Sequence, residues 1–169
     1  MREEFECLGE SYEKRGARLD ETLDILQKMW VGGEVEHHGR FYNFPAIGTN
    51  PAPPGPVPLY FGGHSDQMLI RAARRGDGWI CAPKMEMVEP QIRCLRALRE
   101  EFGRADKPFE FVGICVRPET EVIEKMTALG IGHVIMMSPW KPNLPMGDTV
   151  VGHKAELIEQ LDAEVAKVR

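Results

Sequence analysis

Residues 58–65 read Pro58-Leu59-Tyr60-Phe61-Gly62-Gly63-His64-Ser65, a short apolar stretch that runs into two glycines, a histidine and a serine. We expect a buried strand over 57–61 and a helix over 66–75, with the glycines in the loop between them. Glycine adopts positive φ and lets a ligand approach the backbone closely. A serine before a helix either caps the first turn or donates to an oxygen, and the first-turn amides attract phosphate. The stretch therefore predicts a strand–loop–helix unit that is either a phosphate site or a plain capped turn.

The same strand-then-helix pattern recurs to the end of the chain. Further strands are predicted over 78–82, 109–116 and 131–137, and further helices over 87–102, 119–129 and 153–168. Pro90 is expected in the first turn of its helix, where the missing N–H costs nothing. Each strand is a continuous apolar run, which is typical of a parallel sheet covered on both faces. Four βα units fit either an open doubly wound sheet or half of an eight-stranded barrel, which normally needs about 250 residues.

The first third of the chain has a different pattern. A helix is predicted over 18–30, where apolar residues recur at spacings of three and four. Residues 35–44 predict a β-hairpin, with His38-Gly39 in the turn and aromatic residues alternating on the return strand. Residues 46–58 hold five prolines and predict an irregular connection. We therefore expect a single domain over 1–169, in which a leading helix, hairpin and connection (1–56) precede four βα units (57–169).

Composition argues against several classes of function. The net charge is −5 and the sequence pI about 5.6, without a basic run, so neither nucleic acid nor an anionic membrane is an expected partner. No apolar stretch approaches the roughly 20 residues of a membrane helix, and the first residues do not resemble a secretory signal. The four cysteines show no CxxC spacing and read as reduced core thiols. We therefore expect a cytoplasmic protein.

The histidines and carboxylates do not form a recognisable catalytic set. His37 and His38 are adjacent on a predicted strand and would point to opposite faces, so we expect no metal site there. His64 is the better functional histidine because it lies inside the candidate phosphate loop. No Ser-His-Asp order, Walker loop or GxGxxG is present, and no pair of carboxylates suggests an acid–base dyad. The catalytic residues are therefore left unassigned.

Six segments in the first half of the chain share an order and spacing with one known family. They are Glu3-Glu4-Phe5-Glu6-x-Leu8-Gly9, Arg15-Gly16-x-Arg18-x-x-Glu21, Leu26-x-x-x-Trp30, His38-Gly39-Arg40-Phe41-Tyr42-x-Phe44, Pro58-x-x-Phe61-Gly62-Gly63-x-Ser65 and Ala72-Ala73-x-x-Gly76-Asp77-Gly78-Trp79. Together they resemble the luciferase-like monooxygenases. The resemblance implies a TIM (β/α)8 barrel and an oxidoreductase that acts on a small-molecule substrate. Its closest branch uses the deazaflavin coenzyme F420, with FMN as the alternative cofactor.

The resemblance also implies where a cofactor would bind. Its phosphate would lie at Gly62, Gly63, His64 and Ser65, and its ring system would lie near Ala82 and Pro83, after the next strand. In the family, the segment that resembles residues 3–9 follows the fourth barrel strand, so this chain is expected to represent a half-barrel of units five to eight. A half-barrel leaves sheet edges and an interior face uncovered, which predicts a homodimer. The alternatives are a non-catalytic, self-associating half-barrel with a vestigial anion site and a four-stranded flavodoxin-like binding domain.

Overall fold

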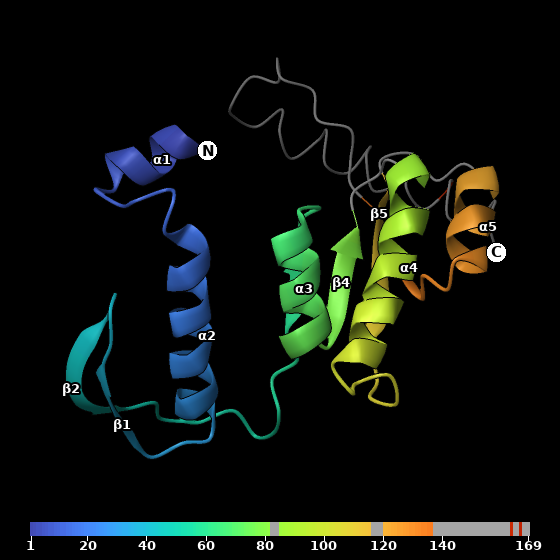
Figure 1. The fold of residues 1–169 in the computed structure, drawn as a ribbon. Coiled ribbons are helices and arrows are strands. Elements are labelled where there is room, and N and C mark those ends of the chain that lie inside the picture. Colours follow the sequence, from blue (N-terminus) through green and yellow to red (C-terminus); the bar gives the residue numbers. More distant parts are fainter. Residues whose placement is uncertain (82–84, 116–119, 137–162, 164–165, 167–169) are drawn as a thin grey trace, which may run out of the picture. The chain divides into compact units, whose positions relative to one another are not determined.

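The structure, a computed structural model, describes residues 1–81, 85–115, 120–136, 163 and 166. The chain divides into two compact units, Met1–Val57 and Pro58–Arg169, whose elements are labelled in Figure 1. Ala82 and Pro83 lie outside the described residues. The helix expected over 153–168 also lies outside them, except for positions 163 and 166. No helix of the described part is long and apolar enough to cross a membrane.

The first unit contains two helices and a two-stranded antiparallel sheet. Helix α1 spans Arg2–Cys7, helix α2 Arg15–Trp30, strand β1 Glu34–His38 and strand β2 Asn43–Gly48. Helix α2 confirms the predicted helix and begins three residues earlier than expected. Helix α1 was not expected from the sequence because it buries no residue and so shows no apolar stripe.

The hairpin exists, but the prediction of its turn was wrong. The turn runs from Gly39, whose N–H donates to the carbonyl oxygen of Tyr42 at 2.9 Å, and pairing begins at His38 and Asn43. The aromatic residues Phe41 and Tyr42 therefore lie in the turn and do not alternate along the return strand. Strand β2 instead continues to Gly48, three residues into the expected irregular connection.

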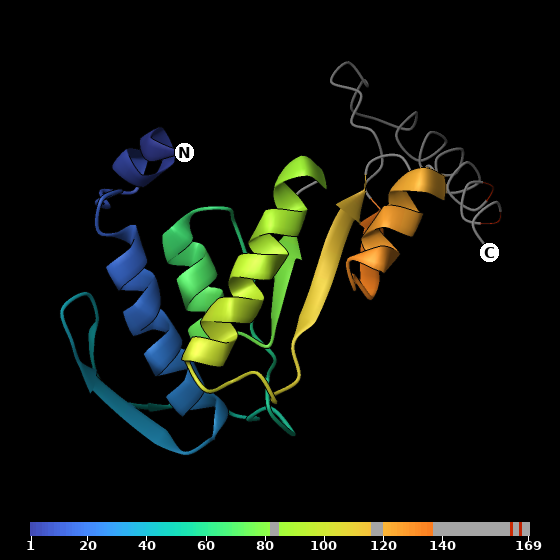
Figure 2. The same cartoon turned by 45° about the vertical axis from the view of Figure 1, so that its right-hand side comes forward.

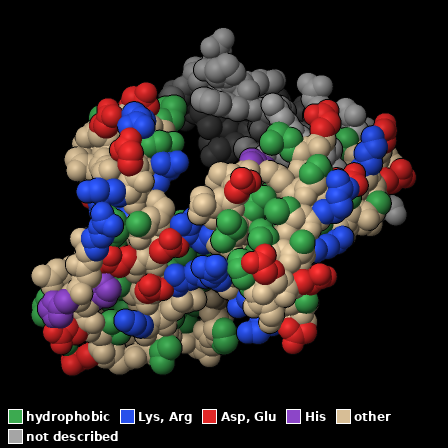
Figure 3. All heavy atoms as spheres, in the orientation of Figure 1, with side chains coloured by type: hydrophobic (Ala, Val, Ile, Leu, Met, Phe, Trp, Pro, Cys, Tyr) green, Lys and Arg blue, Asp and Glu red, His purple; other side chains and the backbone are tan. Residues whose placement is uncertain are grey.

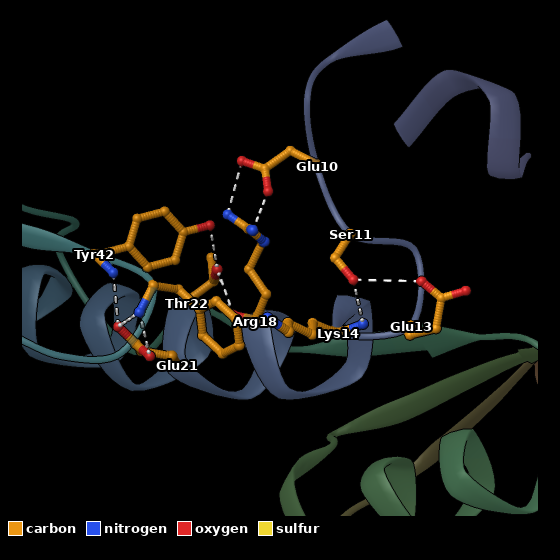
Figure 4. Close-up of polar contacts among 9 residues, drawn as sticks. Glu10, Ser11, Glu13, Lys14, Arg18, Glu21, Thr22 and Tyr42 are labelled. Atoms are coloured by element: carbon orange, nitrogen blue, oxygen red, sulfur yellow. Dashed lines mark hydrogen bonds and ion pairs between the residues drawn. The ribbon is translucent and has the colours of Figure 1, made fainter. Parts of the chain in front are cut away.

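The carboxylate of Glu21 on α2 explains this wider turn (Figure 4). It accepts the backbone N–H groups of Arg40 at 3.2 Å, Phe41 at 3.0 Å and Tyr42 at 2.9 Å, and it lies 3.0 Å from Nε2 of His37. Amides bound to a carboxylate do not take part in a strand ladder, so the second strand starts only after them. Burial alone would raise the pKa of Glu21, but the hydrogen bonds from His37 and the turn amides outweigh it and lower that pKa.

The second unit is built on a four-stranded parallel sheet, as predicted. Its strands follow one another in sequence order, β3 (Tyr60–Gly62), β4 (Gly78–Cys81), β5 (Glu110–Cys115) and β6 (His133–Met136). The connecting helices are α3 (Asp66–Arg75), α4 (Met85–Glu101) and α5 (Thr120–Ala128). A doubly wound sheet reverses its strand order at a switch point, whereas a (β/α)8 barrel keeps sequence order. The described strands therefore have the order of a barrel segment, and closure of a barrel stays a prediction.

Helices α3 and α4 pack side by side on one face of this sheet (Figures 1 and 2). Right-handed crossovers that step in one direction place successive helices on the same face. Phe61 and Trp79 are register partners on that face, and Trp79 is fully buried. Because side chains alternate along a strand, Gly62 and its partner Ile80 belong to the opposite face. The core beneath the helices also includes Leu69, Ala72, Ala73, Val88, Ile92 and Leu95.

Strand β3 is shorter than the predicted strand over 57–61 because the side chain of Asp77 intervenes at its start. Asp77 Oδ2 accepts the N–H of Leu59 at 2.9 Å, and the Asp77 N–H donates to the Leu59 carbonyl oxygen at 2.8 Å. These two hydrogen bonds engage the backbone N–H and carbonyl oxygen of Leu59, so the hydrogen-bond ladder of β3 begins at Tyr60. Asp77 thus fixes the entry into β3 at the amino-terminal end of the sheet, away from the loop after Gly62.

The expected position of Pro90 in its helix was wrong. Helix α4 begins at Met85, so Pro90 is its sixth residue and lies inside the helix, beyond the first turn. There the missing N–H removes one intrahelical hydrogen bond. The outer surface of α4 and α5 carries acidic and basic side chains in mixture (Figure 3), including the pairs Glu89–Arg93 and Glu121–Lys125. Their spacing of four residues is that of stabilising helix-surface ion pairs.

Candidate functional site

The segment from Gly62, the last residue of β3, to Ser65, the N-cap residue of α3, connects the carboxyl end of the strand to the amino terminus of the helix. In parallel α/β folds, ligands bind at this end of the strands. Gly63 has φ +107, a conformation that other residues rarely adopt, and Ser65 is the N-cap residue in an extended conformation. A Cβ built on Gly62 would meet no heavy atom of the described residues within 4 Å. Gly62 is thus the last residue of β3, so the expectation that both glycines lie in the loop was wrong for Gly62, while Gly63, His64 and Ser65 form the loop. The described residues leave open space beside Gly62.

Two side chains hold the carbonyl groups of this loop. The indole N–H of Trp79 donates to the Gly63 carbonyl oxygen at 3.0 Å, and Nε2 of Gln91 donates to the His64 carbonyl oxygen at 3.2 Å. Trp79 comes from β4 and Gln91 from α4, so the loop is tied to the strand and the helix that follow α3. Sequence reasoning missed both residues, because a buried tryptophan and a helical glutamine carry no motif.

The anchored carbonyls determine where the amides point. In a trans peptide the C=O and the following N–H point in opposite directions. Since the carbonyls of Gly63 and His64 face Trp79 and Gln91, the N–H groups of His64 and Ser65 face away from them. The α3 amides at Met68 and Leu69 donate to the Ser65 carbonyl oxygen, at 2.8 and 3.0 Å. The N–H groups of His64 and Ser65 lie beside those of the first α3 residues, and backbone donors at a helix amino terminus attract an anion. We call this group of N–H donors the cradle.

The side chain of Ser65 does not cap the helix. It makes no cap hydrogen bond, although Ser65 occupies the N-cap position and is exposed. The plain capped turn, which the sequence allowed, is therefore not what the structure contains. One charge opposes an anion here, because Asp66 stands in the first turn of α3. A phosphate in the cradle would therefore be held by backbone donors against one nearby carboxylate.

The ring of His64 belongs to the same assembly. Its Nδ1 lies 2.9 Å from Oε1 of Gln91, and the ring meets Trp79 edge-on with centroids 5.9 Å apart. His64 is half-buried, whereas Gly62, Gly63 and Ser65 are exposed. The structure thus brings His64 and the three other predicted loop residues together, while Ala82 and Pro83 stay outside the described residues.

His37 and His38 have hydrogen-bond partners of their own in the first unit. His37 contacts Glu21, and His38 lies 2.5 Å from Oε1 of Glu36 and 2.6 Å from Oδ1 of Asn43. The hydrogen bonds to Glu36 and Asn43 raise the pKa of His38. Within the described part of the chain, no group of three or more His, Cys, Asp or Glu side chains is placed to hold a metal ion.

A polar cluster at the other end of the sheet lies on the first residues of three strands. The Tyr60 hydroxyl donates to Oε2 of Glu110 at 2.5 Å, and Nδ1 of His133 lies 3.6 Å from the same oxygen. The hydrogen bond to Glu110 raises the pKa of Tyr60. Tyr60 crosses over Gly78, where a Cβ would lie 2.4 Å from its ring. The cluster joins β3, β5 and β6 at the amino-terminal end of the sheet, and the Tyr60 side chain passes over β4 to do so.

Comparison with known proteins identifies a family. A family model described as luciferase-like monooxygenase matches residues 2–128. An uncharacterized protein of Mycobacterium tuberculosis is 35% identical over 136 residues, which are 79% of this chain and 46% of that protein. The F420-dependent glucose-6-phosphate dehydrogenase of Mycolicibacterium gilvum is 31% identical over 96 residues, 57% of this chain and 29% of the enzyme. The chain thus spans about half, or less, of the length of these relatives.

Solved structures agree on the fold. A riboflavin lyase with modified FMN and riboflavin has a TM-score of 0.55 at 18% identity, over 84% of this chain and 41% of that one. DmoA of Hyphomicrobium sulfonivorans has a TM-score of 0.51 at 16% identity, over 89% of this chain and 42% of that one. At such identities the likeness concerns the arrangement of strands and helices alone.

Proposed function

Because this chain belongs to the luciferase-like monooxygenase family, we propose that it carries the cofactor-phosphate site of an F420- or FMN-dependent oxidoreductase. The observation that carries the proposal is the outward direction of the loop amides. The carbonyls of Gly63 and His64 are bound by Trp79 and Gln91, and within the described part of the chain the N–H groups of His64 and Ser65 make no backbone hydrogen bond that would compete with a ligand. Backbone N–H groups at a helix amino terminus are well suited to a phosphate.

The residues of the loop fit such a group in three respects. The φ of Gly63 lets the chain turn from strand to helix, and the open space beside Gly62 lets a ligand approach the backbone. The hydroxyl of Ser65 is not used as a cap and would donate to a phosphate oxygen. Hydride transfer would be supplied by the bound flavin or deazaflavin, while this chain binds and orients it. Ala82 and Pro83 remain proposed neighbours of its ring system, and the catalytic acid or base is left unassigned.

Coenzyme F420 is the cofactor we favour. Several curated relatives are F420-dependent glucose-6-phosphate dehydrogenases, 28% identical in Gordonia bronchialis and 31% in Mycolicibacterium gilvum. FMN is the alternative, since a similar fold occurs in a riboflavin lyase that holds modified FMN. The substrate is proposed to be a small molecule.

A titration of the full chain with F420 and with FMN tests the proposal. Binding is followed by cofactor fluorescence and by the melting temperature. We expect saturable binding at micromolar cofactor, with F420 binding more tightly. Gly62→Ala is the informative variant, because its methyl group would enter open space without positive φ and so would not strain the fold. We expect it to keep its melting temperature and to lose cofactor affinity.

Gly55→Ala is the matched control, since its Cβ would also meet nothing within 4 Å and Gly55 belongs to the other unit. Equal affinities of the Gly62→Ala and Gly55→Ala variants would contradict the proposed site. If neither cofactor binds and sedimentation shows a dimer, the alternative of a non-catalytic, self-associating module is favoured instead.

A further inference from the structure

The contact between Gln91 and His64 defines the orientation of the Gln91 amide. One end of this amide faces the His64 carbonyl oxygen at 3.2 Å, and the other faces Nδ1 of the His64 ring at 2.9 Å. A carbonyl oxygen only accepts hydrogen bonds. The nitrogen of Gln91 must therefore face the carbonyl, and its oxygen must face the ring.

This orientation in turn decides which ring nitrogen of His64 carries a proton. An amide oxygen only accepts, so Nδ1 must be the donor and must hold a hydrogen. In a neutral imidazole the second nitrogen then has none and is an acceptor. The two nitrogens point away from each other around the ring, so Nε2 is directed away from Gln91.

We infer that Gln91 holds His64 in the Nδ1–H form, so that Nε2 accepts a hydrogen bond from a hydroxyl group next to the ligand phosphate. The inference rests on the proposed function, because the phosphate is the one placed in the cradle of loop amides. The backbone amides of the cradle are all donors, and Nε2 of His64 adds a neutral acceptor to the charged one of Asp66. A ligand that satisfies both carries a phosphate and an alcohol on a nearby carbon, as a polyol phosphate does. Gln91 is then a positioning residue and His64 a specificity-determining one.

The protonation state is read directly by NMR of protein labelled with ¹⁵N-histidine. The chain has five histidines, and His64→Gln removes one set of signals and so assigns it. At about pH 8 we expect the Nδ1–H pattern for His64. We expect it to persist in Gln91→Glu, which keeps an acceptor, and to change toward Nε2–H in Gln91→Met. Glu100→Met, an exposed site on the same helix, is the control and leaves the pattern unchanged.

Two phosphate esters test the consequence for binding. Glycerol 3-phosphate and n-propyl phosphate share the phosphate and the three-carbon chain, and only the first has hydroxyl groups. We expect the first to bind about fivefold more tightly, on the order of one neutral hydrogen bond, and the preference to disappear in His64→Phe and in Gln91→Met.

An Nε2–H pattern for His64 in the unaltered protein would overturn the inference whether or not a cofactor binds. Equal binding of the two esters, or no binding of either, would also overturn it. An Nδ1–H pattern and a preference for glycerol 3-phosphate, without binding of F420 or FMN, would support the inference and reject the proposed cofactor.

Discussion

Replacement of Trp79 by phenylalanine tests whether the carbonyl anchors hold the candidate site. Trp79 is fully buried on β4, and its indole N–H donates to the Gly63 carbonyl oxygen at 3.0 Å. Phenylalanine keeps an aromatic ring in the core but removes the donor. Trp79→Phe should therefore lower the stability of the second unit and also release the loop.

Two terms set the expected size of the effect. Loss of a hydrogen-bond donor to a buried carbonyl costs about 1–3 kcal/mol, and we take about 1 kcal/mol because Gly63 is exposed and water can replace the indole. Truncation of a buried aromatic to alanine costs about 3–5 kcal/mol, so the smaller change to phenylalanine should cost about 1–2 kcal/mol. Together Trp79→Phe should lower the free energy of unfolding by about 2–3 kcal/mol. If the roughly 1 kcal/mol of the lost hydrogen bond between Trp79 and Gly63 is needed to hold the loop for the cofactor, its loss lowers cofactor affinity about fivefold.

Urea unfolding followed by circular dichroism gives the first quantity, and fluorescence titration with F420 or FMN under native conditions gives the second. Leu95→Ala is the control, because Leu95 is buried on α4 and its hydrocarbon side chain has no group that could hydrogen-bond to the loop. It should lose about 2–5 kcal/mol of stability and keep its cofactor affinity. Unchanged affinity in Trp79→Phe, despite lower stability, would show that Trp79 is a core residue only and would refute the anchoring argument.

Three further predictions concern other parts of the fold. The pKa of Glu21 is lowered from the ordinary 4.5, so the carboxylate stabilises the fold fully above that pH and this stabilisation is lost as the pH falls through the lowered pKa. The melting temperatures of the protein and of Glu21→Gln should therefore converge on acidification. A difference in melting temperature that stays constant with pH would contradict this. Gly76→Ala would place a Cβ 2.6 Å from a backbone oxygen and should cost about 1–3 kcal/mol in urea unfolding, whereas Gly132→Ala, with open space around it, should be neutral. Burial raises the pKa of the Cys81 thiol, so mass spectrometry should find it alkylated far more slowly than the exposed Cys94, and equal rates would argue against a buried Cys81.

The regular elements of the second unit were predictable because their signals are local. Helix α3 begins and ends where the sequence predicts, since an apolar face at helical spacing lies between the Ser65 cap position and Gly76. The continuous apolar strands correctly predicted a parallel sheet. The errors arose where a distant side chain competes with the backbone. Glu21 reaches the hairpin amides across 19 to 21 residues, and Asp77 reaches Leu59 across 18, so neither effect is visible in a local window.

The same reasoning explains why the candidate loop was found but its construction was not. Two glycines and a serine after a strand indicate a backbone that is able to bind an anion, yet they do not say which way its amides point. That direction depends on what the carbonyls contact, and the partners come from 16 and 27 residues further along the chain. Trp79 and Gln91 look like an ordinary core residue and an ordinary helix residue. They acquire a role only because β4 and α4 fold next to the loop, so a variant that keeps all four loop residues but lacks either partner should bind the cofactor more weakly.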